Sequence, residues 1–167
     1  MKNIILIGMP GSGKTTVADL CAEVYKKQVW DTDKYIESLH GGISEIFAEH
    51  GEEHFRNLET DAVREICGNS DCLISTGGGC VLRDENVRML KDSGRIVYLR
   101  AKKETLLKRL EGDGTRPLLA GKTEERLTNL FEKRAPVYER VADITVDTDG
   151  LTPRQVLENI FDKIGRE

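Results

Sequence analysis

The stretch Gly8-Met9-Pro10-Gly11-Ser12-Gly13-Lys14-Thr15 directly follows the aliphatic run Asn3-Ile4-Ile5-Leu6-Ile7. Together they fit a buried strand, then the pattern G-x-x-x-x-G-K-[ST], then a helix. Glycines at these spacings let backbone N–H groups converge on phosphate oxygens, and the helix adds the positive end of its dipole. Lys14 then reaches the β- and γ-phosphates, and the Thr15 hydroxyl suits Mg²⁺. We therefore expect residues 8–15 to bind a nucleoside triphosphate.

Short apolar runs alternate with longer segments of helical period over the rest of the chain. Besides the first run, we expect strands at residues 28–30, 72–75, 95–99 and 144–146. We expect helices over residues 15–25, from 33, over 44–67 with an interruption at 51, over 84–92 and 103–110, and from 153. Asp84 and Thr152 are the expected N-caps of two helices, and Gln155 completes a capping box with Thr152. The expected fold class is α/β: a three-layer P-loop fold with helices on both faces of a parallel sheet.

The composition fits a single domain over residues 1–167. Hydrophobic residues make up 38% and charged residues 32% of the chain, which excludes a disordered protein. The net charge of −4, from 25 basic and 29 acidic residues, argues against nucleic acid as a partner. No apolar run approaches the roughly 20 residues that span a bilayer, and the N-terminus lacks a signal-peptide pattern. We expect a cytoplasmic monomer that does not contact membranes and keeps its four cysteines reduced.

Two aspartates, in Asp31-Thr32-Asp33, follow the second expected strand. Ligands of parallel sheets bind at the carboxyl ends of strands, so both carboxylates are expected to face the phosphate loop. Residues spaced by two also point to the same side of an extended segment. One carboxylate then holds water on Mg²⁺, and the other accepts a proton from an attacking hydroxyl. The alternative, in which Asp33 caps a helix and Asp31 is merely exposed, stays open at this point.

Three glycines, Gly77-Gly78-Gly79, follow the third expected strand. Their bare backbone N–H groups suit substrate hydroxyls or a carboxylate, and a tight turn without a ligand is the alternative. Ser75 takes the strand-end position at which many P-loop proteins carry an aspartate associated with Mg²⁺. This leaves the acidic role to Asp31.

Three arginines form a group that the net charge does not predict. Arg56 has Glu59 one helical turn on. Arg116 begins the motif R-P-L-L, and Arg134 begins R-x-P-x-Y, which we expect to follow a helix. Singly, each is expected to be a solvated cation; together they suit an anionic substrate held in a fork geometry. Residues 111–123 have no periodicity and are rich in glycine and charge, which is typical of a mobile active-site lid.

These motifs, in this order and spacing, resemble those of shikimate kinases, within the nucleoside-monophosphate-kinase-like P-loop proteins. The shared motifs are G-M-P-G-S-G-K-T-T, D-T-D, F-R, the triple glycine, R-P-L-L and R-x-P-x-Y. The resemblance covers nearly the whole chain. It implies five parallel strands in the order 2-3-1-4-5, a substrate-binding helical region at about 33–67 and a lid at about 111–123. It also implies ATP-dependent phosphorylation of the shikimate 3-hydroxyl, on the route to chorismate and the aromatic amino acids.

For the substrate site, the resemblance implies roles for residues of four motifs. Asp33 would bind the 3-hydroxyl of shikimate and act as its general base, or stand in for one. Arg56 and Arg134 would grip the carboxylate of shikimate, and the backbone of Gly78 and Gly79 would contact it. Supporting contacts would come from Glu59, Phe47 and Phe55.

For the nucleotide site, the resemblance implies ATP as co-substrate and Mg²⁺ as cofactor. Thr15 would bind Mg²⁺, with Asp31, joined by Ser75, acting through water. Lys14 and Arg116 would stabilise charge on the transferred phosphoryl group. The other nucleotide-binding residues would be Gly11, Ser12, Gly13, Thr16, Arg109 and Pro153, the last two on either side of adenine, with the turn Asp147-Thr148-Asp149 beside them.

Two alternative functions and one departure from the family pattern stay open. A gluconate-type kinase shares the phosphate loop and a carboxylate-bearing substrate, but is not expected to combine D-T-D with these arginines. A non-catalytic shikimate-binding module could lose Lys14, Asp33 or Arg116, and all three are present. Cys80 follows the triple glycine where a small residue is expected; we expect it to pack in the interior, with a reactive thiol as the alternative.

Overall fold

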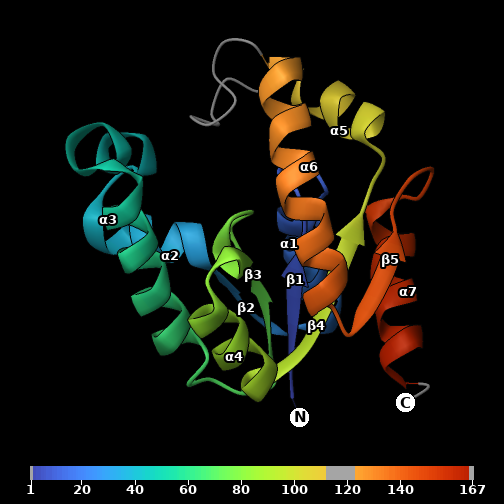
Figure 1. Ribbon diagram of the computed structural model, residues 1–167. Coiled ribbons are helices and arrows are strands. Elements are labelled where there is room, and N and C mark those ends of the chain that lie inside the picture. Colours follow the sequence, from blue (N-terminus) through green and yellow to red (C-terminus); the bar gives the residue numbers. More distant parts are fainter. Residues whose placement is uncertain (1, 112–122, 166–167) are drawn as a thin grey trace.

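The computed structural model describes residues 2–111 and 123–165, and its strands form one parallel sheet (Figure 1). The five strands in this part of the chain are β1 (Asn3–Ile7), β2 (Gln28–Asp31), β3 (Cys72–Ser75), β4 (Gly94–Arg100) and β5 (Ile144–Asp147). Their order is β2-β3-β1-β4-β5, and each neighbouring pair is parallel. The predicted fold class and strand order are confirmed.

The helices alternate with the strands. They are α1 (Lys14–Tyr25), α2 (Thr32–His40), α3 (Ile43–Ile66), α4 (Asp84–Ser93), α5 (Lys103–Leu110), α6 (Thr123–Val141) and α7 (Pro153–Gly165), with a short 3-10 helix, η1 (Cys80–Leu82). Helix α3 breaks at Gly51, as predicted. The predicted capping box of α7 is confirmed, because the Gln155 N–H donates to Thr152 Oγ1 at 3.2 Å and the Thr152 N–H donates to Gln155 Oε1 at 2.9 Å.

Alternate side chains of the central strand β1 point to opposite faces of the sheet, which produces three layers. Ile5 and Ile7 pack in one buried cluster with residues of α3, α4, α5 and α6. Ile4 and Leu6 pack in a second cluster with residues of α1 and α7. Helix α2 and part of α3 share a smaller third cluster, and Figure 1 shows them beside the β2 side of the sheet. The prediction of helices on both faces is confirmed.

The parallel pairing brings the carboxyl ends of β1, β2 and β3 to one edge of the sheet. Ser75, at the end of β3, is in register with Leu6 of β1 and with Asp31 of β2. The phosphate loop, the D-T-D motif and the triple glycine each follow one of these strands. Three segments far apart in the sequence therefore begin at the same edge, where ligands of parallel sheets bind.

Three local predictions are wrong. Helix α2 begins at Thr32, so Asp33 lies in its first turn and neither caps a helix nor lies on an extended segment. The N-cap of α4 is Arg83, and Asp84 is already helical. The motif R-x-P-x-Y lies inside α6 and does not follow a helix. Although Pro136 removes one backbone donor, the helix continues to Val141, which is buried in the cluster on the sheet.

The predicted lid lies outside the described residues, apart from its two ends, and so does Arg116. In the part of the chain that the structure describes, no helix is both long and apolar enough to cross a membrane.

Strands β1 and β4 approach closely where Gly94 begins β4. A Cβ atom on Gly94 would lie 2.1 Å from the backbone oxygen of Asn3 and 2.7 Å from Cδ1 of Ile5. The first of these atoms belongs to the backbone of a central strand and has little freedom to move. A side chain at this position therefore requires the two strands to separate.

We expect Gly94→Ala to lower the free energy of unfolding by about 3 kcal/mol, because overpacking a buried site has a cost of this order. The matched control is Gly165→Ala near the end of α7, where a Cβ atom meets no described atom within 4 Å. The control should be as stable as the wild type or slightly more stable. Urea unfolding followed by circular dichroism measures both variants, and equal stability of the two would contradict the close approach.

Candidate functional site

The phosphate loop joins β1 to helix α1 and presents backbone N–H groups. Gly11 and Gly13 have φ angles of 82° and 94°, a left-handed conformation that residues with side chains rarely adopt. Gly13 is the N-cap of α1 and makes no side-chain capping bond, and the first turn of the helix carries no acidic residue. The first-turn N–H groups therefore have no capping side chain in the described structure. This arrangement binds phosphate at helix N-termini.

Lys14 lies against the loop. It is 9% exposed, and its Nζ donates to the backbone oxygens of Gly8 at 2.7 Å and Met9 at 3.0 Å, and to Ser12 Oγ at 3.4 Å. These bonds hold a positive charge next to the N–H groups of the loop. A polyanion bound there can replace some of the carbonyl contacts with stronger charge-assisted bonds to its own oxygens.

A cavity of about 400 Å³ extends from the phosphate loop to the beginning of α7. Its size suits a nucleotide, and Leu110, Leu151 and Val156 give it an apolar part. Arg109 also contacts the loop directly, since its Nη1 donates to the backbone oxygen of Gly11 at 3.1 Å. Apart from Arg116, the structure brings all the predicted nucleotide-binding residues to this cavity: Gly11, Ser12, Gly13, Lys14, Thr15, Thr16, Arg109 and Pro153.

A second cavity, of about 520 Å³, adjoins the first. Helices α2, α3 and α6 and the triple glycine contribute its walls. The predicted substrate-binding and supporting residues that line it are Asp33, Phe47, Phe55, Arg56, Glu59, Gly78, Gly79 and Arg134. The residues that line both cavities are Pro10, Thr15, Asp31, Asp33, Gly77 and Gly78. Ligands bound in the two cavities would therefore meet at this shared wall.

The three residues of the D-T-D motif have different roles. Asp31 is the N-cap of α2, and its Oδ1 accepts a bond from the Lys34 N–H at 3.0 Å. Thr32 is fully buried, and its Oγ1 accepts a bond from the Gly77 N–H at 3.0 Å. Asp33 lines both cavities. The two carboxylates do reach the phosphate-loop edge, but they do so because a helix begins between them.

Asp33 faces a second carboxylate across the bare backbone of Gly77. Asp33 Oδ1 and Glu59 Oε2 are both buried and have no hydrogen-bond partner among the described residues. A Cβ atom on Gly77 would lie 2.7 Å from the first oxygen and 2.9 Å from the second. Burial, reinforced by repulsion from Glu59 and Asp31, raises the pKa of Asp33 to about 7. A carboxylate with this pKa can accept a proton at neutral pH.

Arg56 is held by two carboxylates of helix α3. Its Nη1 donates to Glu59 Oε1 at 2.9 Å, and its Nη2 donates to Glu52 Oε1 at 3.2 Å. Burial opposes the positive charge, but these two partners outweigh it and raise the pKa of Arg56, which stays charged. Burial raises the pKa of Glu59, and Arg56 opposes that shift. A Cβ atom on Gly79 would lie 2.5 Å from Arg56 Nη2, so only a bare backbone fits against this guanidinium.

Arg134 reaches the same cavity from helix α6 and is 3% exposed. A Cβ atom on Gly78 would lie 2.9 Å from Arg134 Nη1 and 3.2 Å from Cδ of Pro10. The glycines thus admit two guanidinium groups close to the backbone. Two such groups beside the backbone N–H of Gly79, which has no acceptor among the described residues, suit an anion with more than one oxygen atom.

The wall shared by the two cavities contains oxygen ligands that fit Mg²⁺. Thr15 contributes a hydroxyl and Asp31 a carboxylate, and both are the hard donors that this ion prefers. Mg²⁺ at nucleotide sites takes few protein ligands and completes its shell with water and phosphate. Among the described residues, no three His, Cys, Asp or Glu side chains gather as they would around a metal bound by the protein alone. Ser75 is buried and lines the smaller cavity.

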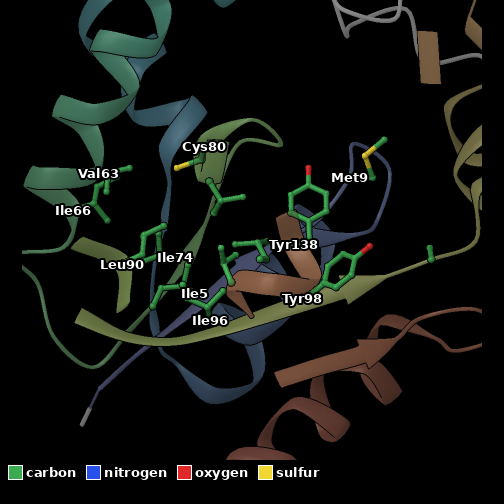
Figure 2. Close-up of a cluster of buried hydrophobic side chains, with 14 of the residues drawn as sticks. Ile5, Met9, Val63, Ile66, Ile74, Cys80, Leu90, Ile96, Tyr98 and Tyr138 are labelled. Atoms are coloured by element: carbon green, nitrogen blue, oxygen red, sulfur yellow. The ribbon is translucent and has the colours of Figure 1, made fainter. Parts of the chain in front are cut away.

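Cys80 directly follows the triple glycine, is fully buried and belongs to the cluster of buried side chains drawn in Figure 2. Burial, followed by the nearby Glu59 and Asp33, raises the pKa of its thiol well above the usual value. A protonated, inaccessible thiol is a poor nucleophile. The expected packing role is confirmed, and this burial disfavours the alternative of a reactive thiol.

Three residues contribute to the site although the sequence analysis gave them no role. Glu52 pairs with Arg56, Thr32 accepts from Gly77, and the Tyr138 hydroxyl donates to the backbone oxygen of Gly78 at 2.5 Å. The i, i+4 spacing of Glu52 is a signal that could have revealed its pairing. The other two contacts join residues 45 and 60 positions apart, and no local pattern predicts them.

Comparison with known proteins relates both the sequence and the fold to one family. The family model described as "SKI: Shikimate kinase" matches residues 10–165. The chain is 45% identical to a shikimate kinase of Thermodesulfovibrio yellowstonii over 168 residues, which cover 99% of this chain and 96% of that one. It is 43% identical to a shikimate kinase of Caldicellulosiruptor bescii over 165 residues, with 96% and 94% covered.

Solved structures agree with these matches. A shikimate kinase from Acinetobacter baumannii in complex with shikimate superposes with a TM-score of 0.93 at 36% identity, covering 98% of this chain and 93% of that chain. A shikimate kinase from Aquifex aeolicus superposes with a TM-score of 0.84 at 32% identity, covering 98% and 96%.

The raised pKa of Asp33 links the stability of the folded protein to pH. The pKa is about 7 in the folded protein and has an ordinary value of 3.8. Between these values the folded protein holds a proton that the unfolded chain has released. The contribution of this group to the free energy of unfolding is therefore fully present below about pH 4, and it is lost as the pH rises through 7.

We expect Asp33→Asn, which mimics the protonated carboxyl, to gain stability relative to the wild type as the pH rises from about 4 to about 8. Three pKa units set an upper limit of about 4 kcal/mol on this gain. Asp92→Asn, on the exposed surface of α4, controls for the change in net charge. Urea unfolding without nucleotide at each pH measures the difference. A difference from the wild type that stays constant with pH would count against the raised pKa.

Proposed function

Because the chain belongs to the shikimate kinase family, we propose that it transfers the γ-phosphoryl group of ATP to the 3-hydroxyl of shikimate. The products are ADP and shikimate 3-phosphate. The observation that carries this proposal is the pair of adjoining cavities, one built on the phosphate loop and the other on two arginines and Asp33. Asp33 lies on the wall between them, which is where an acceptor hydroxyl must meet the terminal phosphate.

Shikimate carries a carboxylate and three hydroxyl groups on one ring, and the larger cavity matches this chemistry. We assign the carboxylate to the guanidinium groups of Arg56 and Arg134, with backbone contacts from Gly78 and Gly79. The pairing of Arg56 with Glu59 and Glu52 holds its fork in place before the substrate arrives. Pre-organisation of this kind lowers the entropy lost on binding.

Asp33 acts on the reacting hydroxyl. Its carboxylate accepts the proton of the 3-hydroxyl while the hydroxyl oxygen forms a bond to the γ-phosphorus. The bond between the γ-phosphorus and the β–γ bridging oxygen breaks, and ADP leaves with that oxygen. A base with a pKa of about 7 is well matched to this proton transfer at neutral pH.

The phosphate loop stabilises the negative charge of the transferred group. The N–H groups of the loop and the Lys14 ammonium lie where the β- and γ-phosphate oxygens are expected. Thr15, with Asp31 acting through water, would hold Mg²⁺, which neutralises charge on the β- and γ-phosphates when it is bound. From the R-P-L-L motif alone, we assign Arg116 to stabilising the negative charge of the transferred phosphoryl group. Arg109 and Pro153 are assigned to the two sides of adenine.

We also propose that the enzyme works as a monomer in the cytoplasm. The binding residues in the described part of the molecule come from one chain and line two adjoining cavities. All four cysteines are free thiols, which suits a reducing compartment. The net charge of −4 gives no general attraction to nucleic acid or to anionic membranes.

The test of this function is the release of ADP from Mg²⁺-ATP with shikimate, gluconate, a panel of nucleoside monophosphates, or water as acceptor. We expect rapid turnover with shikimate and background rates with the others. Turnover with gluconate alone would move the assignment to a gluconate-type kinase. Shikimate binding in calorimetry without turnover would indicate a non-catalytic module.

Two variants separate substrate binding from chemistry. Arg134→Ala should raise the KM for shikimate about 30-fold or more, because a desolvated charged bond to a carboxylate is worth on the order of 2–5 kcal/mol. Asp33→Asn is the contrasting variant, and its kcat should fall by about a hundred- to ten-thousand-fold while its affinity for ATP survives. Steady-state kinetics and calorimetry with ATP measure both. Unchanged shikimate affinity in the first variant would place the carboxylate elsewhere, and near-normal turnover in the second would remove Asp33 as the base.

A further inference from the structure

Tyr138 connects helix α6 to the triple glycine. Its hydroxyl donates to the backbone oxygen of Gly78 at 2.5 Å, and its side chain is fully buried. The ring of Tyr98 on β4 packs against the ring of Tyr138, with the two ring centroids 5.1 Å apart (Figure 2). Burial raises the pKa of Tyr138 above its usual value, so the hydroxyl keeps the proton that it donates. Tyr138 takes no part in the proton transfer or the phosphoryl transfer proposed for this site.

The hydrogen bond from Tyr138 is accepted by the central peptide of a tight turn. The Cys80 N–H donates to the backbone oxygen of Gly77 at 3.1 Å, and this closes a turn with Gly78 and Gly79 at its centre. Gly79 has φ −95° and ψ 1°, the values of the third residue of a type I turn. The central peptide of such a turn bonds to neither end, so its orientation depends on outside contacts.

Glycine at the third position permits this peptide to flip. In a type II turn the central peptide is reversed and the third residue has positive φ, which glycine adopts at little cost. The carbonyl oxygen and the N–H of one peptide point in opposite directions. A flip at this turn would therefore exchange the directions of the Gly78 oxygen and the Gly79 N–H.

The Tyr138 hydroxyl selects one of the two orientations. With the Gly78 oxygen bonded to Tyr138 in the interior, the Gly79 N–H points away from that interior. Among the described residues, this N–H donates to no protein acceptor, whereas the Gly77 N–H donates to Thr32. Gly78 and Gly79 both line the larger cavity. After a flip, the Gly78 oxygen would instead face the cavity and repel an anion there.

We propose that Tyr138 is a positioning residue for substrate, which locks the Gly78–Gly79 peptide so that its N–H serves the anionic end of shikimate. The inference rests on the proposed function. Tyr138 and Arg134 are four residues apart on α6 and share one face of the helix. Helix α6 therefore supplies both Arg134 and the Tyr138 hydroxyl, which fixes the orientation of the neighbouring Gly79 N–H. Gly78 packs between Arg134 and Pro10, so the phosphate loop supports the same turn from its other side.

The test compares Tyr138→Phe with Tyr98→Phe. Each variant removes one buried hydroxyl from the same pair of neighbouring rings, but only the first removes the bond to Gly78, together with a side-chain contact to Arg134. We expect Tyr138→Phe to raise the KM for shikimate about tenfold, the size expected for leaving one buried acceptor unpaired. The KM for ATP should stay within about twofold of the wild type, and Tyr98→Phe should leave the KM for shikimate unchanged.

Two outcomes separate the inference from the function on which it rests. If the wild type does not phosphorylate shikimate, the proposed function fails. If the wild type is active and the two variants have the same KM for shikimate, the positioning role fails. A parallel rise in KM for both substrates would also overturn it, because that result indicates general damage.

A second measurement does not depend on the kinetics of a weakened variant. In the wild type, the ¹⁵N–¹H resonance of Gly79 should shift on addition of shikimate alone and be protected from exchange. In Tyr138→Phe the free-state resonance should already differ, and the protection on addition of shikimate should be reduced. A Gly79 amide that does not respond to shikimate in the wild type would contradict the proposal.

Discussion

The parallel pairing of β1 with β3 is the constraint on which the site depends. It aligns Leu6 with Ser75, so the phosphate loop and the triple glycine leave the sheet at the same edge. A shift of one residue would move one segment past the other by about 3.3 Å and turn every β3 side chain to the opposite face. All five residues of β1 and all four of β3 are buried, which holds this register. A bond from Thr76 Oγ1 to the backbone oxygen of Leu6, at 2.8 Å, continues it beyond the strand.

The larger cavity contains buried carboxylate oxygens that lack hydrogen-bond partners among the described residues. Glu59 neutralises Arg56 through one oxygen, while its second oxygen and Asp33 Oδ1 are left without a described partner. Burying a polar atom without a partner is unfavourable, so the free enzyme carries a cost that a bound hydroxyl can relieve. The same burial raises the pKa of Asp33, and this suits it to accept a proton. The burial that is unfavourable for these oxygens is therefore also the cause of the raised pKa that the proposed proton transfer uses.

The site could be predicted where it depends on local pattern, and less well where it depends on packing. The phosphate loop and the pairing of Arg56 with Glu59 follow from short spacings, and the structure contains both. Asp31 and Asp33 lie at the predicted edge of the sheet, but a helix begins at Thr32 where an extended segment was expected. The motif that contains Pro136 was also expected outside a helix. It lies inside α6, because the packing of that helix outweighs the usual preference of proline for helix ends.

The alternation of strands and helices, the phosphate loop and the identity of the charged groups could all be predicted from the amino-acid sequence. Each of these follows from the chemistry of neighbouring residues, which is readable without coordinates. Which of these groups face one another depends on the packing of the helices and the sheet. The bonds from Gly77 to Thr32 and from Tyr138 to Gly78 span 45 and 60 positions. They depend on how α2 and α6 pack against the sheet, and that packing is the sum of many weak contacts that no short motif records.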